Sequence, residues 1–199
     1  MKSSMRWLLP AVCLLFTFAL IGFYVSTTNK QLGQSSRTFD QLGGDFTLQS
    51  NLGPISLSDD LGKVVILYFG YLSCADVCPT SMGVLSGALH RLTPEQVDKT
   101  SGLMISLDPK RDDLENLQKF TAYFHANIKG VTGSVGSISE VANQYGVFFN
   151  DANTSGAREE YSVDHASRFY IIDKQGQLVT TMSHTTTSNE LAAQIKELL

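Results

Sequence analysis

The sequence predicts a mixed α/β domain with helices on both faces of its sheet, and three patterns indicate this fold class. The continuous apolar run 63–69 has the length and the β-branched residues of a strand that is buried on both faces. The stretch 79–92 follows it with apolar residues at helical spacing. Near the C-terminus, segments 168–172 and 177–182 flank a polar turn and predict an antiparallel hairpin.

Further elements are predicted before and after the first buried strand. Segments 46–49 and 55–57 alternate apolar and polar residues around a Gly-Pro turn, which indicates an N-terminal hairpin. The apolar segment 102–107 predicts a second central strand. The stretch 113–125 begins with acidic residues and has apolar residues at helical spacing, so it predicts a helix.

The last third of the chain carries two helix-start signals. Ser137 opens a Ser-x-x-Glu pattern typical of a capping box, and Gly146 can end that short helix before a strand at 147–149. Ser188 is expected to cap the final helix, whose apolar residues again recur at helical spacing.

The first 25 residues are expected to form a cytoplasmic tail and a transmembrane anchor. Segment 8–25 carries no charge, follows Lys2, Arg6 and Trp7, and is just long enough to cross a bilayer as a helix. A cleaved signal peptide is the alternative, although no small-x-small cleavage site follows the run. Because no amphipathic, Arg-rich presequence precedes the run, a bacterial inner membrane is favoured, with the rest of the chain in the periplasm.

The remaining sequence predicts one tethered domain. Residues 26–38 are polar and rich in Ser, Thr and Gln, which is typical of a tether, so 39–199 is left as the folded domain. The chain of 199 residues has a net charge of -4 and no basic stripe. This balance gives no reason to expect nucleic-acid binding.

The cysteine pair Cys74 and Cys78 is placed between the end of a buried strand and the start of a helix, where open α/β sheets hold their sites. Pro79 suits the first helical turn, so Cys78 is expected at the N-cap, where the helix dipole would lower its pKa in particular. Cys13, the third cysteine, lies within the apolar run and is expected to be a small apolar filler.

Two thiolates three residues apart can converge on one metal ion, and soft donors select copper(I) or zinc. The same sulfurs can close a disulfide. A purely stabilising bridge is the third interpretation, but so short a loop restrains little chain entropy.

A third ligand is expected from a histidine, and His165 is the candidate because it stands just before the strand at 168–172. His184, beyond the last strand, is the weaker alternative. His90 and His125 fall at the ends of helices, where a surface role suffices.

Three segments in this order resemble the Sco/SenC family: 74–79 after a Tyr-Phe-Gly-Tyr strand end, 106–112 (SLDPKRD) and 161–165 (YSVDH). The similarity runs from about residue 46 to 195. The resemblance implies a thioredoxin-like fold with copper as the metal, held as Cu(I) with Cu(II) left open. The ligands it implies are Cys74, Cys78 and His165.

The resemblance also implies a function, which is assembly of the binuclear copper centre of cytochrome c oxidase. The partner would be the copper-bearing subunit of the oxidase or another copper chaperone. The alternative is a membrane-tethered thiol-disulfide oxidoreductase in which Cys74 and Cys78 are the redox pair that keeps partner cysteines reduced. Three residues separate the cysteines and no proline lies near 163–169, which favours metal over general thiol exchange.

Asp108, Arg111 and Asp112 match a segment of the family that is thought to face partners. A helix-capping turn is the other interpretation of this segment.

Overall fold

The computed structural model describes residue 20 and the ranges 39–148 and 167–199. The chain divides into two units, Met1–Thr38 and Phe39–Leu199. The expected anchor and tether lie outside the described residues apart from Leu20, and so does His165. In the part of the chain that is described, no helix combines the length and the apolar character needed to cross a membrane.

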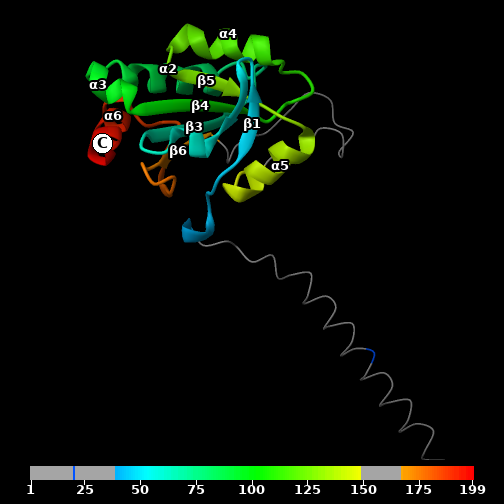
Figure 1. Cartoon of the computed structure of the whole chain (residues 1–199). Helices are drawn as coiled ribbons and strands as arrows, with labels where there is room; N and C mark the ends of the chain where they lie inside the picture. Colours follow the sequence, from blue (N-terminus) through cyan, green and yellow to red (C-terminus); the bar gives the residue numbers. More distant parts are fainter. Residues whose placement is uncertain (1–19, 21–38, 149–166) are drawn as a thin grey trace, which may run out of the picture. The chain divides into compact units, whose positions relative to one another are not determined.

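A five-stranded mixed sheet forms the centre of the second unit (Figure 1). Its spatial order is β5-β4-β3-β6-β7. Strands β3, β4 and β5 run parallel to one another, β6 is antiparallel to β3, and β7 is antiparallel to β6. The strands are β3 (Val64–Gly70), β4 (Thr100–Ser106), β5 (Ile128–Val131), β6 (Arg168–Ile172) and β7 (Leu178–Ser183). The sheet is therefore mixed, as the sequence predicts, and β3 lies at its middle.

The N-terminal hairpin is confirmed as a separate two-stranded sheet of β1 (Thr47–Ser50) and β2 (Gly53–Ser56). Gly53 has a φ of +114°, a conformation that favours glycine and allows the tight turn. Gln49 and Thr132 connect the hairpin to the chain after β5 through a pair of backbone hydrogen bonds.

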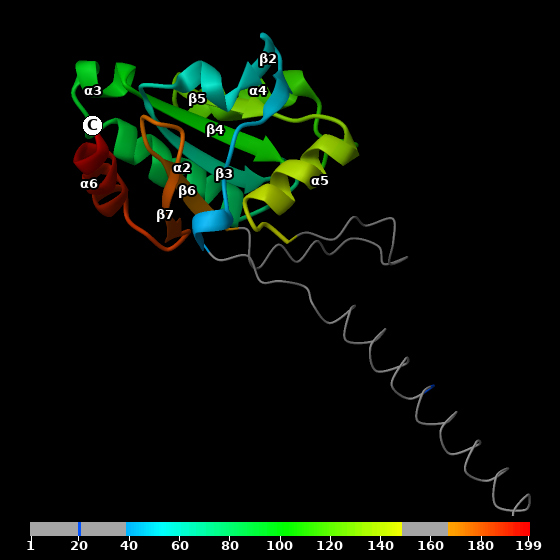
Figure 2. The same cartoon turned by 60° about the horizontal axis from the view of Figure 1, so that its bottom comes forward.

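Five helices are described in the second unit, and they cover both faces of the central sheet (Figure 1 and Figure 2). One face packs against α2, α4 and α6, and the other packs against α5 and the hairpin. The helices are α2 (Val77–Leu89), α3 (Pro94–Asp98), α4 (Leu114–Phe124), α5 (Val135–Gln144) and α6 (Ser188–Leu198). Two short 3-10 helices, Phe39–Gln41 and Leu57–Asp60, flank the hairpin.

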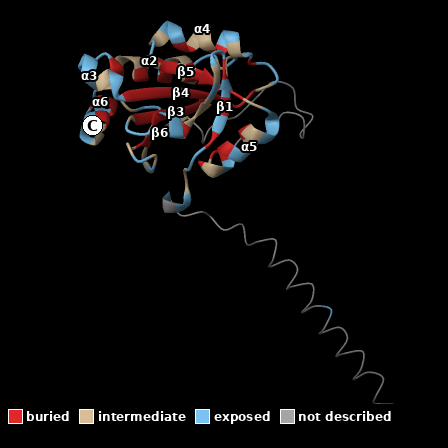
Figure 3. Ribbon diagram, viewed as in Figure 1, coloured by how far each residue is buried: buried red, intermediate tan, exposed pale blue. Residues whose placement is uncertain are grey.

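Strand β3 divides the core because its side chains alternate between the two faces. Val65, Leu67 and Phe69 belong to the cluster under α5, whereas Ile66 and Tyr68 belong to the cluster under α2 and α6. Every residue of β3 and β4 is buried, which Figure 3 shows as a continuous red centre. Burial on both faces explains why β3 reads as an uninterrupted apolar run.

Three predicted helix starts are wrong by one to three residues. Helix α2 begins at Val77, not Pro79, and its N-cap is Asp76. Helix α5 is capped by Ser134, whose hydroxyl accepts the N–H of Ser137, the residue expected to be the cap. Thr187, not Ser188, caps α6 in a capping box with Glu190. More than one serine or threonine stands near the start of α5 and of α6, whereas Asp76 at the start of α2 makes no side-chain capping hydrogen bond.

The structure also differs from the sequence prediction in two short elements, one strand and one helix, and in the described part of one predicted strand. Strand β5 and helix α3 were not predicted, because both are too short to show a clear period. Val147 and Phe148 form no strand, and the rest of the strand expected at 147–149 lies outside the described residues.

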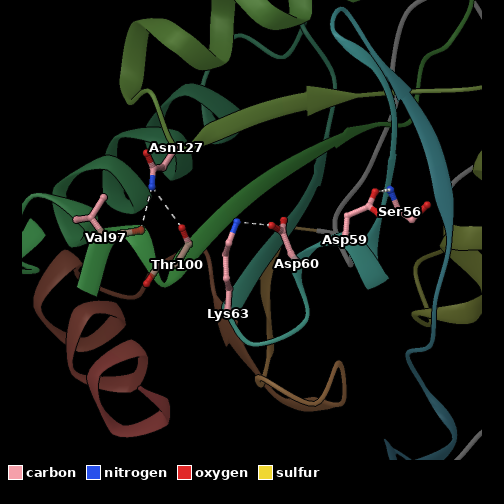
Figure 4. Close-up of polar contacts among 7 residues, drawn as sticks. All are labelled: Ser56, Asp59, Asp60, Lys63, Val97, Thr100 and Asn127. Atoms are coloured by element: carbon pink, nitrogen blue, oxygen red, sulfur yellow. Dashed lines mark hydrogen bonds and ion pairs between the residues drawn. The ribbon is translucent and has the colours of Figure 1, made fainter. Parts of the chain in front are cut away.

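Polar contacts fix the end of the sheet where β3 and β4 begin (Figure 4). The side-chain amide of Asn127 donates to the carbonyl oxygens of Val97 and Thr100 at 2.9 and 3.3 Å. Lys63 pairs with the buried Asp60 at 2.7 Å. These contacts lie at the opposite end of the strands from the cysteine pair, so they support the sheet and not the site.

Candidate metal centre

The cysteine pair lies where the parallel strands end. Gly70 closes β3 beside Ser106, the last residue of β4, and the loop that follows leads into α2. Phe169 pairs with Tyr68, so the chain enters β6 at the same end of the sheet. Loops at the carboxyl ends of parallel strands are the usual location of sites in α/β proteins.

Cys74 is half-buried, and its sulfur receives the backbone N–H of Cys78 at 3.3 Å. Burial alone would raise the pKa of the Cys74 thiol, but hydrogen bonds from the backbone and thiol of Cys78 outweigh it and lower this pKa. The backbone amides of Asp76 and Val77 act in the same direction. The first amides of α2 therefore stabilise a thiolate on Cys74.

Cys78 lies inside the first turn of α2 and is only 4% exposed. Burial, with the neighbouring Cys74 sulfur acting in the same direction, raises the pKa of its thiol to about 12. The expectation of an N-cap Cys78 with a lowered pKa is therefore wrong. The reason is that the helix starts earlier, so its free amides face the preceding cysteine.

Gly70 makes room for the Cys78 sulfur. A Cβ atom at Gly70 would lie 2.9 Å from Cys78 Sγ and 3.0 Å from the ring of Tyr68. The Tyr68 hydroxyl lies 3.9 Å from the same sulfur and donates a weak hydrogen bond to it. Sequence analysis did not single out Gly70 or Tyr68, although both stand in the Tyr-Phe-Gly-Tyr segment before the cysteines.

The donor set of this loop fits a copper ion. Cys74 and Cys78 are both free thiols, and soft sulfur donors suit Cu(I). Within the described ranges, no group of three or more His, Cys, Asp or Glu residues could hold a metal ion. The described residues thus supply two ligands, and the predicted third ligand, His165, lies outside them.

The segment after β4 lies against this loop. Asp112 is 3% exposed, and its Oδ2 accepts the Ser106 hydroxyl at 2.6 Å and the Leu72 N–H at 2.9 Å. Asp108 is also buried and pairs with Arg111, whose side chain is 56% exposed. The partner-facing role of Asp108, Arg111 and Asp112 stays a prediction, and Arg111 is the most exposed of the three. Asp113, the next residue, is the N-cap of α4.

The other three histidines lie in two places. His90 and His125 follow α2 and α4, with ring centroids 5.0 Å apart. His184 is exposed after β7, and its N–H donates to the carbonyl oxygen of Ser167, just before β6. The backbone of His184 thus lies near the start of β6, which keeps it as the weaker alternative ligand.

The two thiols are expected to react at different rates in the reduced, copper-free protein. Iodoacetamide should label Cys74 first near pH 8, because the thiolate is the nucleophile and Cys78 is buried with a pKa of about 12. Lowering the pH should slow the labelling of Cys74, since protonation removes its thiolate. Peptide mapping over a pH series would measure both rates, and preferential labelling of Cys78 would contradict the assignment.

Comparison with known proteins agrees with the fold. The SCO1/SenC family model matches residues 34–199. An SCO2-like protein of Rickettsia prowazekii (strain Madrid E) is 33% identical over 157 residues, which cover 77% of this chain and 76% of the relative.

Two solved structures are similar to the chain over most of its length. Bradyrhizobium japonicum ScoI with copper bound has a TM-score of 0.69 at 29% identity and covers 79% of this chain and 99% of its own. Apo Sco1 of Thermus thermophilus has a TM-score of 0.72 at 33% identity, and the match covers 82% of this chain and 95% of the Thermus chain. Structural neighbours of the chain are thus Sco proteins with copper bound, and its mixed sheet with flanking helices is the thioredoxin-like fold of these proteins. The chain belongs to the SCO1/SenC family.

Proposed function

We propose that this protein is a copper-binding metallochaperone that acts in assembly of the binuclear copper site of cytochrome c oxidase. The observation that carries the proposal is the pairing of two free thiols in one loop, with the Cys78 N–H directed at Cys74 Sγ. Soft sulfur donors favour Cu(I) over harder ions. The similarity to Sco proteins that bind copper supports the same metal.

The proposed ligands are Cys74, Cys78 and His165. Cu(I) bound by two thiolates can accept a third ligand, and His165 precedes β6 by three residues. Support for His165 comes from the topology, because β6 begins at the end of the sheet that carries the cysteines. A three-ligand site can pass its ion to a partner by exchanging one ligand at a time.

A second function, thiol-disulfide exchange, is favoured by the unequal thiols. Cys74, with its lowered pKa, would attack a partner disulfide and release one partner thiol. Cys78 would then lose its proton and attack Cys74 in the mixed disulfide. The products are a Cys74–Cys78 disulfide and a partner dithiol, so two electrons pass to the partner.

The proposed location is a bacterial inner membrane. Residues 1–25 would anchor the chain, 26–38 would tether it, and the 39–199 domain would lie in the periplasm. The partner would be the copper-bearing subunit of the oxidase or another copper chaperone. Arg111, whose side chain pairs with Asp108 and is 56% exposed, would face such a partner.

Chelator competition on the reduced full-length chain in detergent tests the proposal. We expect one tight Cu(I) equivalent, and His165→Ala should weaken it by more than the roughly 10–100-fold cost of losing an outer-shell partner. His90→Ala is the matched control and should leave the affinity unchanged. Absence of tight binding, together with reduction of a partner disulfide by Cys74 and Cys78, would replace the chaperone with the oxidoreductase.

A further inference from the structure

We propose that Asp112 is a positioning residue that holds the cysteine loop in place through the backbone of Leu72. The inference deepens the proposed function, because the loop carries the thiols on which both copper binding and disulfide exchange depend. Asp112 is 38 residues away from Cys74 along the sequence, and its carboxylate faces the loop across the end of the sheet.

The carboxylate of Asp112 is held in one orientation by two donors. Its Oδ2 accepts the Leu72 N–H at 2.9 Å and the Ser106 hydroxyl at 2.6 Å. Ser106 is fully buried at the end of β4, and its oxygen also accepts the N–H of Asp108 at 3.0 Å. Ser106 thus donates to one aspartate and accepts from the backbone of the other, which fixes the position of the Asp112 carboxylate relative to the sheet.

The Leu72 amide is a direct link to the cysteines. Leu72 follows the last strand residue, Gly70, by two positions and precedes Cys74 by two. Cys74 N–H donates to the carbonyl oxygen of Tyr71 at 3.3 Å, so Leu72 lies inside the turn that positions Cys74. A hydrogen bond to a charged acceptor is stronger than one to a neutral acceptor, and the carboxylate that accepts this one is buried.

The burial of Asp112 shows that its positioning role does not depend on contact with a partner protein. Asp112 is 3% exposed, so a partner protein cannot reach its carboxylate while the loop keeps this arrangement. Both of the hydrogen bonds that Oδ2 accepts come from inside the domain. The effect of Asp112 on the thiols is therefore exerted through the backbone of the loop.

Loss of this contact should weaken every reaction that needs the two sulfurs to meet. Copper binding requires both sulfurs at one ion, and disulfide closure requires them to bond to each other. A looser loop lowers their effective concentration for both reactions. In the closure reaction, oxidised glutathione is reduced to two glutathione thiols as Cys74 and Cys78 lose two electrons and two protons.

The test compares Asp112→Ala with Asp113→Ala in the full-length chain in detergent. Asp113 is the adjacent carboxylate, which is exposed and caps α4 without contacting the loop, so its loss lowers stability alone. For Asp112→Ala we expect the equilibrium constant for disulfide closure against glutathione and the Cu(I) affinity each to fall by roughly tenfold or more. Asp113→Ala should leave both within about twofold of the parent.

Asp112→Asn is the second variant, because its amide oxygen can still accept the Leu72 N–H. The equilibrium constant for disulfide closure in Asp112→Asn should lie between those of the parent and of Asp112→Ala. The asparagine variant also allows the test to be made if the alanine variant fails to fold. The inference is overturned if the Asp112 variants shift the disulfide constant no more than Asp113→Ala does. Failure of the parent to bind Cu(I) would instead remove the proposed function, since the disulfide measurement needs no copper.

Discussion

Replacing either cysteine of the loop is expected to abolish tight Cu(I) binding by the reduced protein. Cys74 and Cys78 are the two thiol ligands proposed for the ion, and Cys78 N–H orients the Cys74 sulfur. Losing one sulfur leaves a two-ligand site, so the affinity should fall by more than the roughly 10–100-fold seen when only an outer-shell partner is lost. Cys74→Ser suits the half-exposed position, whereas Cys78→Ala avoids burying a hydroxyl beside Tyr68 and Met104.

Ala75→Ser is the matched control for this experiment, because Ala75 is an exposed residue between the two cysteines. The Ala75→Ser variant should still bind one equivalent of Cu(I) tightly in chelator competition. The two cysteine variants should also lose any disulfide exchange, since each leaves a single thiol in the loop. Retention of one tight copper equivalent by Cys74→Ser would show that the ion is held elsewhere.

The sequence predicts the central strands and the long helices well because their patterns come from burial. Strand β3 is an apolar run because both of its faces are covered, and α4 shows helical spacing because one face packs on the sheet. Strand β5 and helix α3 have four and five residues, too few to display a period. The caps of α5 and α6 differ from the predicted residues because several serines and threonines stand near each of these two starts.

The candidate site is predicted as a set of residues but not as a geometry. Cys74 and Cys78 follow from their place between a strand and a helix, yet which thiol is activated depends on where α2 starts. The earlier start at Val77 directs the free amides to Cys74 and buries Cys78. Asp112 was matched to a partner-facing segment, and its contact with Leu72 spans 40 residues, which no local pattern reveals.

Gly70→Ala is expected to destabilise the fold and to displace the Cys78 sulfur. The new methyl group would lie 2.9 Å from Cys78 Sγ and 3.0 Å from Tyr68 Cε1, both closer than ordinary contacts. The Tyr68 ring cannot easily move away, because it packs against Phe169 with ring centroids 5.5 Å apart. Overpacking of a buried site of this kind costs about 1–3 kcal/mol of unfolding free energy. Denaturant unfolding of the reduced, copper-free protein would measure it.

The matched control is Gly83→Ala, at an exposed position within α2 where an added Cβ meets no atom within 4 Å. Alanine is a better helix former than glycine, so this variant should be more stable than the parent by about 0.5–1 kcal/mol. It should bind Cu(I) as the parent does, whereas Gly70→Ala should bind more weakly because Cys78 Sγ has been displaced. Equal unfolding free energies and equal affinities for the two variants would contradict the close approach at Gly70. Opposite signs of the two stability changes would instead locate the packing constraint at Gly70, where the added Cβ meets Cys78, Tyr68 and Met104, since the chemical change is the same in both variants.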